Sequence, residues 1–256
     1  MSHLMINGVV HQKAAHCEEH GAYTSYQLEL GGPVWTDCPL CSEQAVKNEN
    51  RRIADSQQDD LNRQRGEAMF NNAGIPRRHQ QSALSSYECG NDQQRGVCKA
   101  VCDYARNIET NVESGNGLIM LGQMGTGKTH LAIGLIRVAT RNNRVASKYI
   151  TAPSLFTRVR ASYSSREESE QEILSEMTSI PLLVIDEIGT GKGSANEVDI
   201  LNAVLTQRYD DCRPTVIISN LQPAELKEWL GDRVVDRLKE TSPVILFNWE
   251  SHRGQS

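Results

Sequence analysis

The chain has 256 residues, of which 23% are charged and 5% are aromatic, and its net charge is −5 at pH 7. This length suffices for one α/β core plus a smaller segment. The acidic balance excludes indiscriminate coating of nucleic acid, and the lack of a long apolar run excludes a membrane span. Because the N-terminus does not follow the plan of a signal peptide, we expect a cytoplasmic protein whose seven cysteines are thiols or metal ligands.

Residues 1–45 hold two tight pairs of metal-ligand residue types, and 17 residues separate the pairs. A turn within each pair lets both side chains reach one tetrahedral ion. Three thiolates and one imidazole leave no open position, so the pattern predicts a structural zinc. The predicted ligands are Cys17, His20, Cys38 and Cys41. His11 and His16 are alternatives to His20, and unliganded cysteines are the alternative to zinc. The Gly-Gly-Pro of residues 31–33 is expected to form a hairpin turn.

Residues 43–72 are rich in Gln, Asn, Arg and Glu and contain no proline, which predicts one long helix. The apolar residues Val46, Ile53, Leu61 and Ala68 recur every seven or eight positions and form a narrow stripe. Two interpretations remain open, a solvated spacer and a helix that docks on a partner protein. The predicted domains are a zinc-ribbon-like segment (1–45), a helical linker (46–73) and an ATPase domain (74–256).

From residue 74 onward, apolar runs alternate with amphipathic stretches. Helices are expected over 129–143, from Pro153, and over 166–179. Strands are expected at 117–121, 145–150, 182–186, 215–219 and 244–248. Strands that alternate with helices predict an α/β fold with a parallel sheet flanked by helices.

GQMGTGKT (122–129) fits G-x-x-x-x-G-K-[ST] at every fixed position, between a predicted strand and a predicted helix. Glycines let backbone N–H groups surround phosphate oxygens, and the helix start adds its positive dipole end. Lys128 is expected to neutralise the β- and γ-phosphates, and Thr129 to ligate Mg²⁺. The predicted nucleotide-binding residues are Gly122, Gln123, Met124, Gly125, Thr126, Gly127, Lys128 and Thr129.

Polar residues end the next two buried strands. Asp186 follows the run LLVI and is expected to hold Mg²⁺ through water, while Glu187 is the candidate base for the attacking water. Asn220 ends TVIIS, on a strand expected beside the phosphate loop, where its amide can hold that water. The alternative for Asn220 is an ordinary turn residue.

These residues resemble the AAA+ ATPases, and specifically the DnaC family of bacterial and phage replicative helicase loaders. The resemblance covers roughly 70–253 and includes GIPRRHQQSALSSYE, GTGKTHLA, LLVIDEIG, IISN, GDRVVDRL and ILFNWESHR. It implies an arginine finger at Arg237 and a sensor-2 arginine at Arg253. It also implies a helix over 153–163 that contacts single-stranded DNA, for which Arg158, Arg160 and Tyr163 are available. The first 70 or so residues do not match the family's helical helicase-binding domain, and the chain leaves no room for an AAA+ lid.

The function that this resemblance implies is ATP-dependent loading of a DnaB-like replicative helicase onto single-stranded DNA. ATP hydrolysis, slow and dependent on assembly or DNA, would act as a release switch, and the subunits would associate through their AAA+ domains. The implied cofactors are ATP and Mg²⁺, in addition to Zn²⁺ at the front. The alternative is an IstB-like ATPase helper of a transposase that acts on double-stranded DNA. A third hypothesis is a zinc-dependent nucleic-acid adaptor whose nucleotide site only controls shape.

Overall fold

The computed structural model describes residues 9–29, 32–164, 168–191 and 193–251. The chain divides into two compact units, Met1–Asn62 and Arg63–Ser256, which we describe separately. Within the described ranges, none of the helices combines the length and the apolar character that crossing a bilayer requires.

The first unit contains a small antiparallel sheet in the order β1-β2-β3. Its strands are β1 (Val9–Cys17), β2 (Gly21–Glu29) and β3 (Pro33–Trp35). Cys17 pairs with Gly21 across a tight turn, and the positive φ of Gly21 (78°) suits a residue that closes such a turn. Glu29 pairs with Pro33, so the chain reverses direction between these two residues, and part of the predicted Gly-Gly-Pro turn lies outside the described residues.

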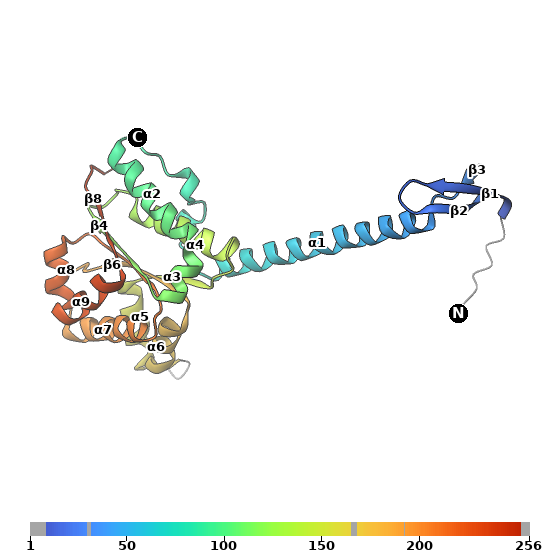
Figure 1. The fold of residues 1–256 in the computed structure, drawn as a ribbon. Coiled ribbons are helices and arrows are strands. Elements are labelled where there is room, and N and C mark those ends of the chain that lie inside the picture. Colours follow the sequence, from blue (N-terminus) through green and yellow to red (C-terminus); the bar gives the residue numbers. More distant parts are fainter. Residues whose placement is uncertain (1–8, 30–31, 165–167, 192, 252–256) are drawn as a thin grey trace. The chain divides into compact units, whose positions relative to one another are not determined.

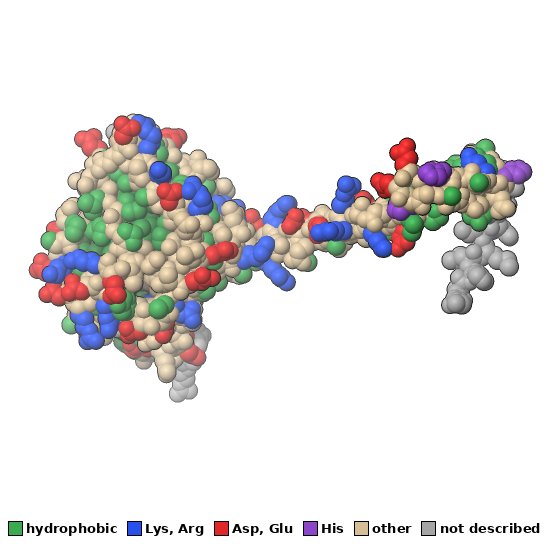
Figure 2. Space-filling view, viewed as in Figure 1, with side chains coloured by type: hydrophobic (Ala, Val, Ile, Leu, Met, Phe, Trp, Pro, Cys, Tyr) green, Lys and Arg blue, Asp and Glu red, His purple; other side chains and the backbone are tan. Residues whose placement is uncertain are grey.

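Helix α1 (Pro39–Asn71) confirms the single long helix predicted over 43–72. It begins four residues earlier than expected, because proline is compatible with the first turn of a helix. Val46, Ile53 and Leu61 of the narrow stripe are 59%, 47% and 49% exposed. Charged side chains are prominent along α1 (Figure 2), and Lys47 forms an i,i+4 ion pair with Glu43 at 2.7 Å. Both interpretations of this helix therefore remain predictions.

The last turns of α1 belong to the second unit, where they pack on the end of α4 (Lys128–Arg141). A Cβ on Gly66 would lie 2.8 Å from the Cα of Arg141, so only glycine allows this approach. Phe70 is buried, and the guanidinium carbons of Arg137 and Arg141 lie 4.3 and 4.5 Å from the centre of its ring. This contact fixes where the chain enters the second unit.

The second unit is built on a five-stranded sheet whose strand pairs are all parallel (Figure 1). The strand order is β5-β6-β7-β4-β8. The strands are β4 (Leu118–Gly122), β5 (Ser147–Thr151), β6 (Leu182–Ile188), β7 (Thr215–Ser219) and β8 (Val244–Phe247). All five lie where the apolar runs predicted them, to within two residues at either end. The order places β4, which leads into GQMGTGKT, between β7 and β8.

Helices cover both faces of this sheet (Figure 1). Alternate residues of β4 show the division, because Ile119 and Leu121 belong to one buried apolar cluster, and Leu118 and Met120 to the other. Helices α2, α3 and α4 contribute to the Leu118 cluster, and α5 to α9 contribute to the Ile119 cluster. The other elements are η1 (Arg77–His79), η2 (Leu84–Ser86), α2 (Asp92–Arg106), α3 (Ile108–Ser114), α5 (Ala152–Ser162), α6 (Glu170–Ser179), α7 (Ala195–Asp210), α8 (Pro223–Leu230) and α9 (Asp232–Thr241).

The acidic helix predicted over 166–179 begins later than expected, at Glu170. Ser169 caps it, since its side chain accepts from the backbone N–H of Glu172 and the Glu172 carboxylate accepts from the Ser169 N–H at 2.7 Å. This capping box starts the helix at that point. Residues 166 and 167 of the predicted first turn lie outside the described part of the chain.

Arg208 of α7 is fully buried. Its guanidinium donates hydrogen bonds to backbone carbonyls and a hydroxyl at the ends of neighbouring elements, rather than to a carboxylate. Each acceptor lies at a strand start or at the end of α6, so one guanidinium ties these segments to α7. The acceptors, at 2.6–3.2 Å, are the carbonyls of Met177, Ile180, Pro181 and Pro214 and the Thr215 hydroxyl. Removing this side chain would strand several buried carbonyl groups at once.

Arg208→Met is therefore expected to lower the free energy of unfolding by about 3 kcal/mol or more, because each buried group left unpaired costs about 1–3 kcal/mol. Urea denaturation followed by circular dichroism measures the change. Arg106→Met is the matched control, since the Arg106 ion pair with Asp103 is exposed and its loss should cost less than about 1 kcal/mol. Equal stability of the two variants would contradict the role assigned to Arg208.

Candidate nucleotide and zinc sites

The loop between β4 and α4 has the backbone that a phosphate loop needs. Gly125 and Gly127 have φ of 79° and 95°, a region that favours glycine. At Gly122, a Cβ would lie 2.4 Å from the carbonyl oxygen of Phe247, so the end of β8 also requires glycine there. Met124 is 62% exposed at the loop. The loop runs directly into the N-terminus of α4, where backbone N–H groups and the helix dipole favour an anion.

Lys128 lies among oxygen atoms at the carboxyl edge of the sheet and is 5% exposed. Its Nζ donates to the carbonyls of Gly122 at 2.6 Å and Gln123 at 2.7 Å, and to Oδ1 of Asn220 at 2.9 Å. The strand order explains the last contact, because β7, which Asn220 follows, pairs directly with β4. The structure thus brings together the phosphate loop and Asn220, which the sequence selected separately.

Asp186 and Glu187 reach the same pocket although they are consecutive in the chain. The pairing of β6 with β7 is irregular between Ile185 and Ile188, and Glu187 has a positive φ of 61°. In a regular strand, consecutive side chains point to opposite faces, and an irregularity of this kind redirects one of them. A non-glycine residue in this conformation is held at some cost, a feature common at functional sites.

Thr129 and Asp186 form an oxygen pair suited to a magnesium ion. The Thr129 hydroxyl donates to Oδ2 of Asp186 at 2.7 Å. The same carboxylate accepts from the Tyr149 hydroxyl at 2.9 Å and from the Glu187 N–H at 2.7 Å. Mg²⁺ prefers hard oxygen ligands and usually takes one or two protein ligands together with phosphates and water. The residues present therefore fit this cation.

The pocket at this edge has a volume of about 250 Å³. Sequence reasoning missed four of its residues, namely Arg78, His79, His130 and Tyr149. Burial raises the pKa of Tyr149, so its hydroxyl stays protonated and donates to Asp186. Only the strand order, which pairs β5 with β6, shows that Tyr149 lies near Asp186. The predicted residues that line the pocket are Met124, Gly125, Gly127, Lys128, Thr129, Asp186, Glu187 and Asn220.

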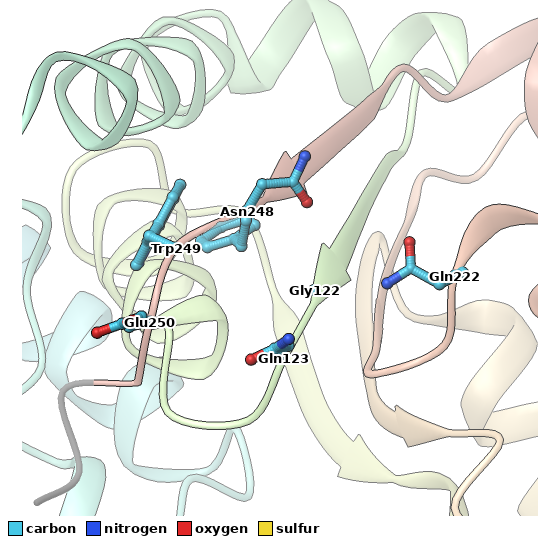
Figure 3. A pocket seen from close by; sticks show the side chains of 7 residues that line it. Gly122, Gln123, Gln222, Asn248, Trp249 and Glu250 are labelled. Atoms are coloured by element: carbon cyan, nitrogen blue, oxygen red, sulfur yellow. The ribbon is translucent and has the colours of Figure 1, made fainter.

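A second cavity of about 320 Å³ lies beside the loop, between the ends of β4 and β8 and the start of α8 (Figure 3). Figure 3 shows Asn248, Trp249 and Glu250 on the segment that follows β8, and Gln123 at the start of the loop. The two loop residues on this side are Gly122 and Gln123. Thr126, the remaining loop residue, is buried, and its hydroxyl donates to the Gln123 carbonyl at 2.8 Å.

Of the two arginines predicted from the family resemblance, Arg237 does not line the nucleotide pocket. Arg237 lies on α9, where its guanidinium carbon is 5.2 Å from the centre of the Tyr209 ring and Nη2 is 3.7 Å from Asp210. Nη1 of Arg237 is buried and has no hydrogen-bond partner among the described residues. Arg233, one turn earlier, is exposed. Arg253 lies outside the described residues.

Two of the three candidate DNA-contact residues of α5 are engaged in ion pairs. Arg158 contacts Glu168, and its Nη1 lies 2.6 Å from Oε2 of Glu176. The sequence could not show this, because both carboxylates come from the segment that follows α5 and folds back onto it. Arg160 forms a single ion pair with Glu197 at 3.2 Å. Tyr163 is 59% exposed.

In the first unit, the four predicted zinc ligands converge with all four ligand atoms within 4.8 Å of one another. Nδ1 of His20 lies 3.6, 3.8 and 3.3 Å from the sulfurs of Cys17, Cys38 and Cys41, and the Cys17 and Cys41 sulfurs are 3.5 Å apart. Tetrahedral zinc has Zn–S bonds of about 2.3 Å and Zn–N bonds of about 2.0 Å. The ligand atoms should then be about 3.5–3.8 Å apart, and the four spacings given above, 3.3–3.8 Å, are close to this range.

Strand geometry favours His20 over His11 and His16 as the fourth ligand. His16 precedes Cys17 on β1, and consecutive side chains of a strand point to opposite faces. His11 lies six residues before Cys17, about 20 Å along the strand.

Hydrogen bonds from His20 lower the pKa of the Cys17 thiol to about 6, whereas the hydrogen bond with Cys17 raises the pKa of the Cys41 thiol to about 12. Crowded thiols that resist joint ionisation suit a divalent cation.

Comparison with known proteins shows the family to which the chain belongs. A family model described as "IstB-like ATP binding protein" matches residues 54–256. The replicative helicase loader DnaC of Escherichia coli K12 is 30% identical over 188 residues, which are 73% of this chain and 75% of that protein. DnaC of Buchnera aphidicola from Acyrthosiphon pisum is 31% identical over 71% of this chain and 73% of its own. The chain belongs to the IstB-like ATP-binding family, among the DnaC helicase loaders.

Two solved structures share the fold of this chain. The crystal structure of the DnaC helicase loader matches with a TM-score of 0.61 and 24% identity, over 67% of this chain and 99% of that one. AMPPCP-bound DnaA from Aquifex aeolicus matches with a TM-score of 0.54 and 20% identity, over 64% of this chain and 50% of that one. The AAA+ fold predicted from the sequence is confirmed. The four clustered Cys and His residues lie before residue 54, outside the family model.

His20→Ala is expected to abolish stoichiometric zinc binding, because a closed four-ligand site loses one ligand. His16→Ala is the matched control and should retain zinc, since its side chain points to the other face of β1. Zinc content of the purified full chain, by atomic absorption, measures both. Loss of zinc in the His16 variant, or full retention in the His20 variant, would show that the ligand set is wrong.

Proposed function

We propose that this protein is an ATP-dependent loader that places a replicative helicase on single-stranded DNA in the cytoplasm. The observation that carries the proposal is a complete phosphate site in a chain 30% identical to DnaC replicative helicase loaders over 73% of its length. The proposed organisation is a zinc segment (1–45), a linker helix (46–73) and an ATPase domain (74–256). The zinc segment and linker are the candidate contact with the helicase.

The nucleotide site supports hydrolysis of the β–γ bond of ATP. In this proposal, Lys128 and the loop N–H groups bind the phosphates, while Thr129 and Asp186 hold a magnesium ion that neutralises phosphate charge. Glu187 takes a proton from the attacking water, and Asn220 orients that water. Lys128 has then to exchange its bonds with Gly122, Gln123 and Asn220 for bonds to phosphate, and the structure already places it at the pocket.

Hydrolysis is proposed to be slow until subunits assemble. Arg237 does not line its own pocket, and its buried Nη1 has no hydrogen-bond partner among the residues described. An arginine supplied in trans can stabilise the charge that develops at the γ-phosphate. When phosphate leaves, both the subunit that held the ATP and the neighbour that supplied Arg237 lose a contact. Hydrolysis can therefore act on the whole assembly, as a switch for helicase release requires.

Single-stranded DNA is the proposed nucleic-acid ligand, with α5 as its contact. Arg158 forms ion pairs with Glu168 and Glu176, so we propose Arg160 and the exposed Tyr163 as the contacts with DNA. An aromatic ring can stack on any base, which suits binding without sequence preference. The family model is described as IstB-like, so a transposase helper is the competing outcome of the test below.

The test mixes the full chain with the replicative helicase and with a transposase, each in ATP and in ADP, and uses native mass spectrometry to report partner and stoichiometry. Glu187→Gln should bind ATP, form the helicase complex and fail to release the helicase, because its amide cannot take the proton from water; hydrolysis should fall at least about 100-fold. Glu228→Gln, at an exposed site on α8, is the control. Capture of the transposase alone, or unchanged release by Glu187→Gln, refutes the loader proposal.

Arg237→Ala should leave ATP binding by the isolated subunit within about twofold while reducing assembly-dependent hydrolysis about 1,000-fold, the scale of an arginine finger. Arg233→Ala removes an exposed arginine one turn earlier on the same helix and serves as the matched control. Single-subunit ATP affinity and steady-state hydrolysis across protein concentrations are the two measurements. Equal loss of affinity and hydrolysis would place Arg237 in its own subunit's site or in its fold.

A further inference from the structure

One backbone carbonyl of the phosphate loop accepts two side-chain hydrogen bonds. The Tyr87 hydroxyl lies 3.1 Å from the oxygen of Thr126, and Nε1 of Trp249 lies 3.2 Å from the same oxygen. Tyr87 directly follows η2, before the sheet begins, and Trp249 follows β8, the last strand. A carbonyl oxygen has two lone pairs, so both donors can bond to it at once. A segment that precedes the first strand of the sheet and one that follows its last strand thus meet at the loop.

The bonded carbonyl determines where the next N–H points. The peptide between Thr126 and Gly127 is trans, and in a trans peptide the C=O and the following N–H point in opposite directions. With the Thr126 oxygen held against Tyr87 and Trp249, the Gly127 N–H is directed to the other side. Gly127 lines the pocket that also contains Lys128 and Thr129. A rotation of this peptide would lose both hydrogen bonds and turn the N–H away.

Both donors are themselves held in place. The centre of the Trp249 ring lies 5.0 Å from that of Phe247, which is fully buried and packs closely against Gly122. The Tyr87 ring lies against Gly127, where a Cβ would come within 2.4 Å of Cε2. Burial raises the pKa of Tyr87 to about 12, so its hydroxyl remains a donor at neutral pH. Both rings therefore have packing contacts in addition to their bonds to the Thr126 carbonyl.

We propose that Tyr87 and Trp249 are positioning residues of the nucleotide site, which fix the Thr126–Gly127 peptide with its N–H toward the phosphates before nucleotide binds. The inference rests on the proposed ATP binding and adds the means by which the loop is preorganised. It also makes phosphate affinity depend on the segment after β8. Each bond contributes to affinity because a preformed site pays no ordering cost on binding.

The test removes each donor atom: Tyr87→Phe keeps the ring itself, and Trp249→Phe keeps an aromatic, though smaller, side chain. Tyr87→Phe and Trp249→Phe are each expected to raise the dissociation constant of ADP about three- to tenfold, the range for one hydrogen bond. In the double variant, the increase in the ADP dissociation constant should exceed the product of the two single-variant increases, because in each single variant the remaining donor still holds the carbonyl. Isothermal titration of the full chain measures ADP affinity, and the melting temperature without nucleotide should change by less than about 2 °C.

Tyr104→Phe is the matched control, because it deletes the same hydroxyl from a bond to a backbone carbonyl, that of Asn116 at 2.6 Å, away from the loop. Wild-type ADP affinity in the double variant would show that the rings only pack and would overturn the proposal. A fall in melting temperature that accounts for the affinity loss would overturn it as well. Helicase binding does not enter this test, so failure of the loader proposal would leave its outcome unchanged.

Discussion

Parallel pairing of β4 with β7 on one side and β8 on the other is the constraint on which the nucleotide site depends. Carboxyl ends of parallel strands meet at one edge of a sheet, so whatever follows each strand is gathered there. The loop after β4 therefore lies next to Asn220 after β7 and next to Trp249 after β8. Moving β4 to the edge of the sheet would separate these groups, even with every strand intact.

The site at that edge is held in shape by the chain's own bonds. Lys128 bonds to the loop and to Asn220, Asp186 accepts from Thr129 and Tyr149, and the Thr126 carbonyl accepts from two aromatic side chains. Preformed polar contacts of this kind reduce the reorganisation that phosphate binding needs. Arg237 stands apart from this arrangement, which is consistent with a site completed by a neighbouring subunit.

The zinc segment has a different physical basis. One hairpin, a three-residue strand and a helix start bury little apolar surface, and a bound metal is a common way to stabilise so small a unit. Cys38 directly precedes α1 and Cys41 lies in its first turn, so an ion bound by the four clustered residues would join the sheet to the start of the helix.

Local patterns were enough to predict much of this protein. The strands are continuous apolar runs because both sheet faces are covered, and the phosphate loop and the zinc ligands are short motifs whose spacing is set by bond geometry. The start of α6 was placed wrongly, because the capping box at Ser169 outweighs the acidic run before it. The pairing of Arg158 with Glu168 and Glu176 was also missed, since it depends on how α6 folds back.

The sequence by itself therefore predicted the element types, the phosphate loop and the four Cys and His residues that the structure brings together, because each depends on residues close together in the chain. Only the tertiary structure decided that Tyr149 bonds to Asp186, that Tyr87 and Trp249 meet at the Thr126 carbonyl, and that Arg237 lies away from its own pocket. These contacts join residues from separate strands and connecting segments. Their partners follow from the order of strands in the sheet, which no local pattern encodes.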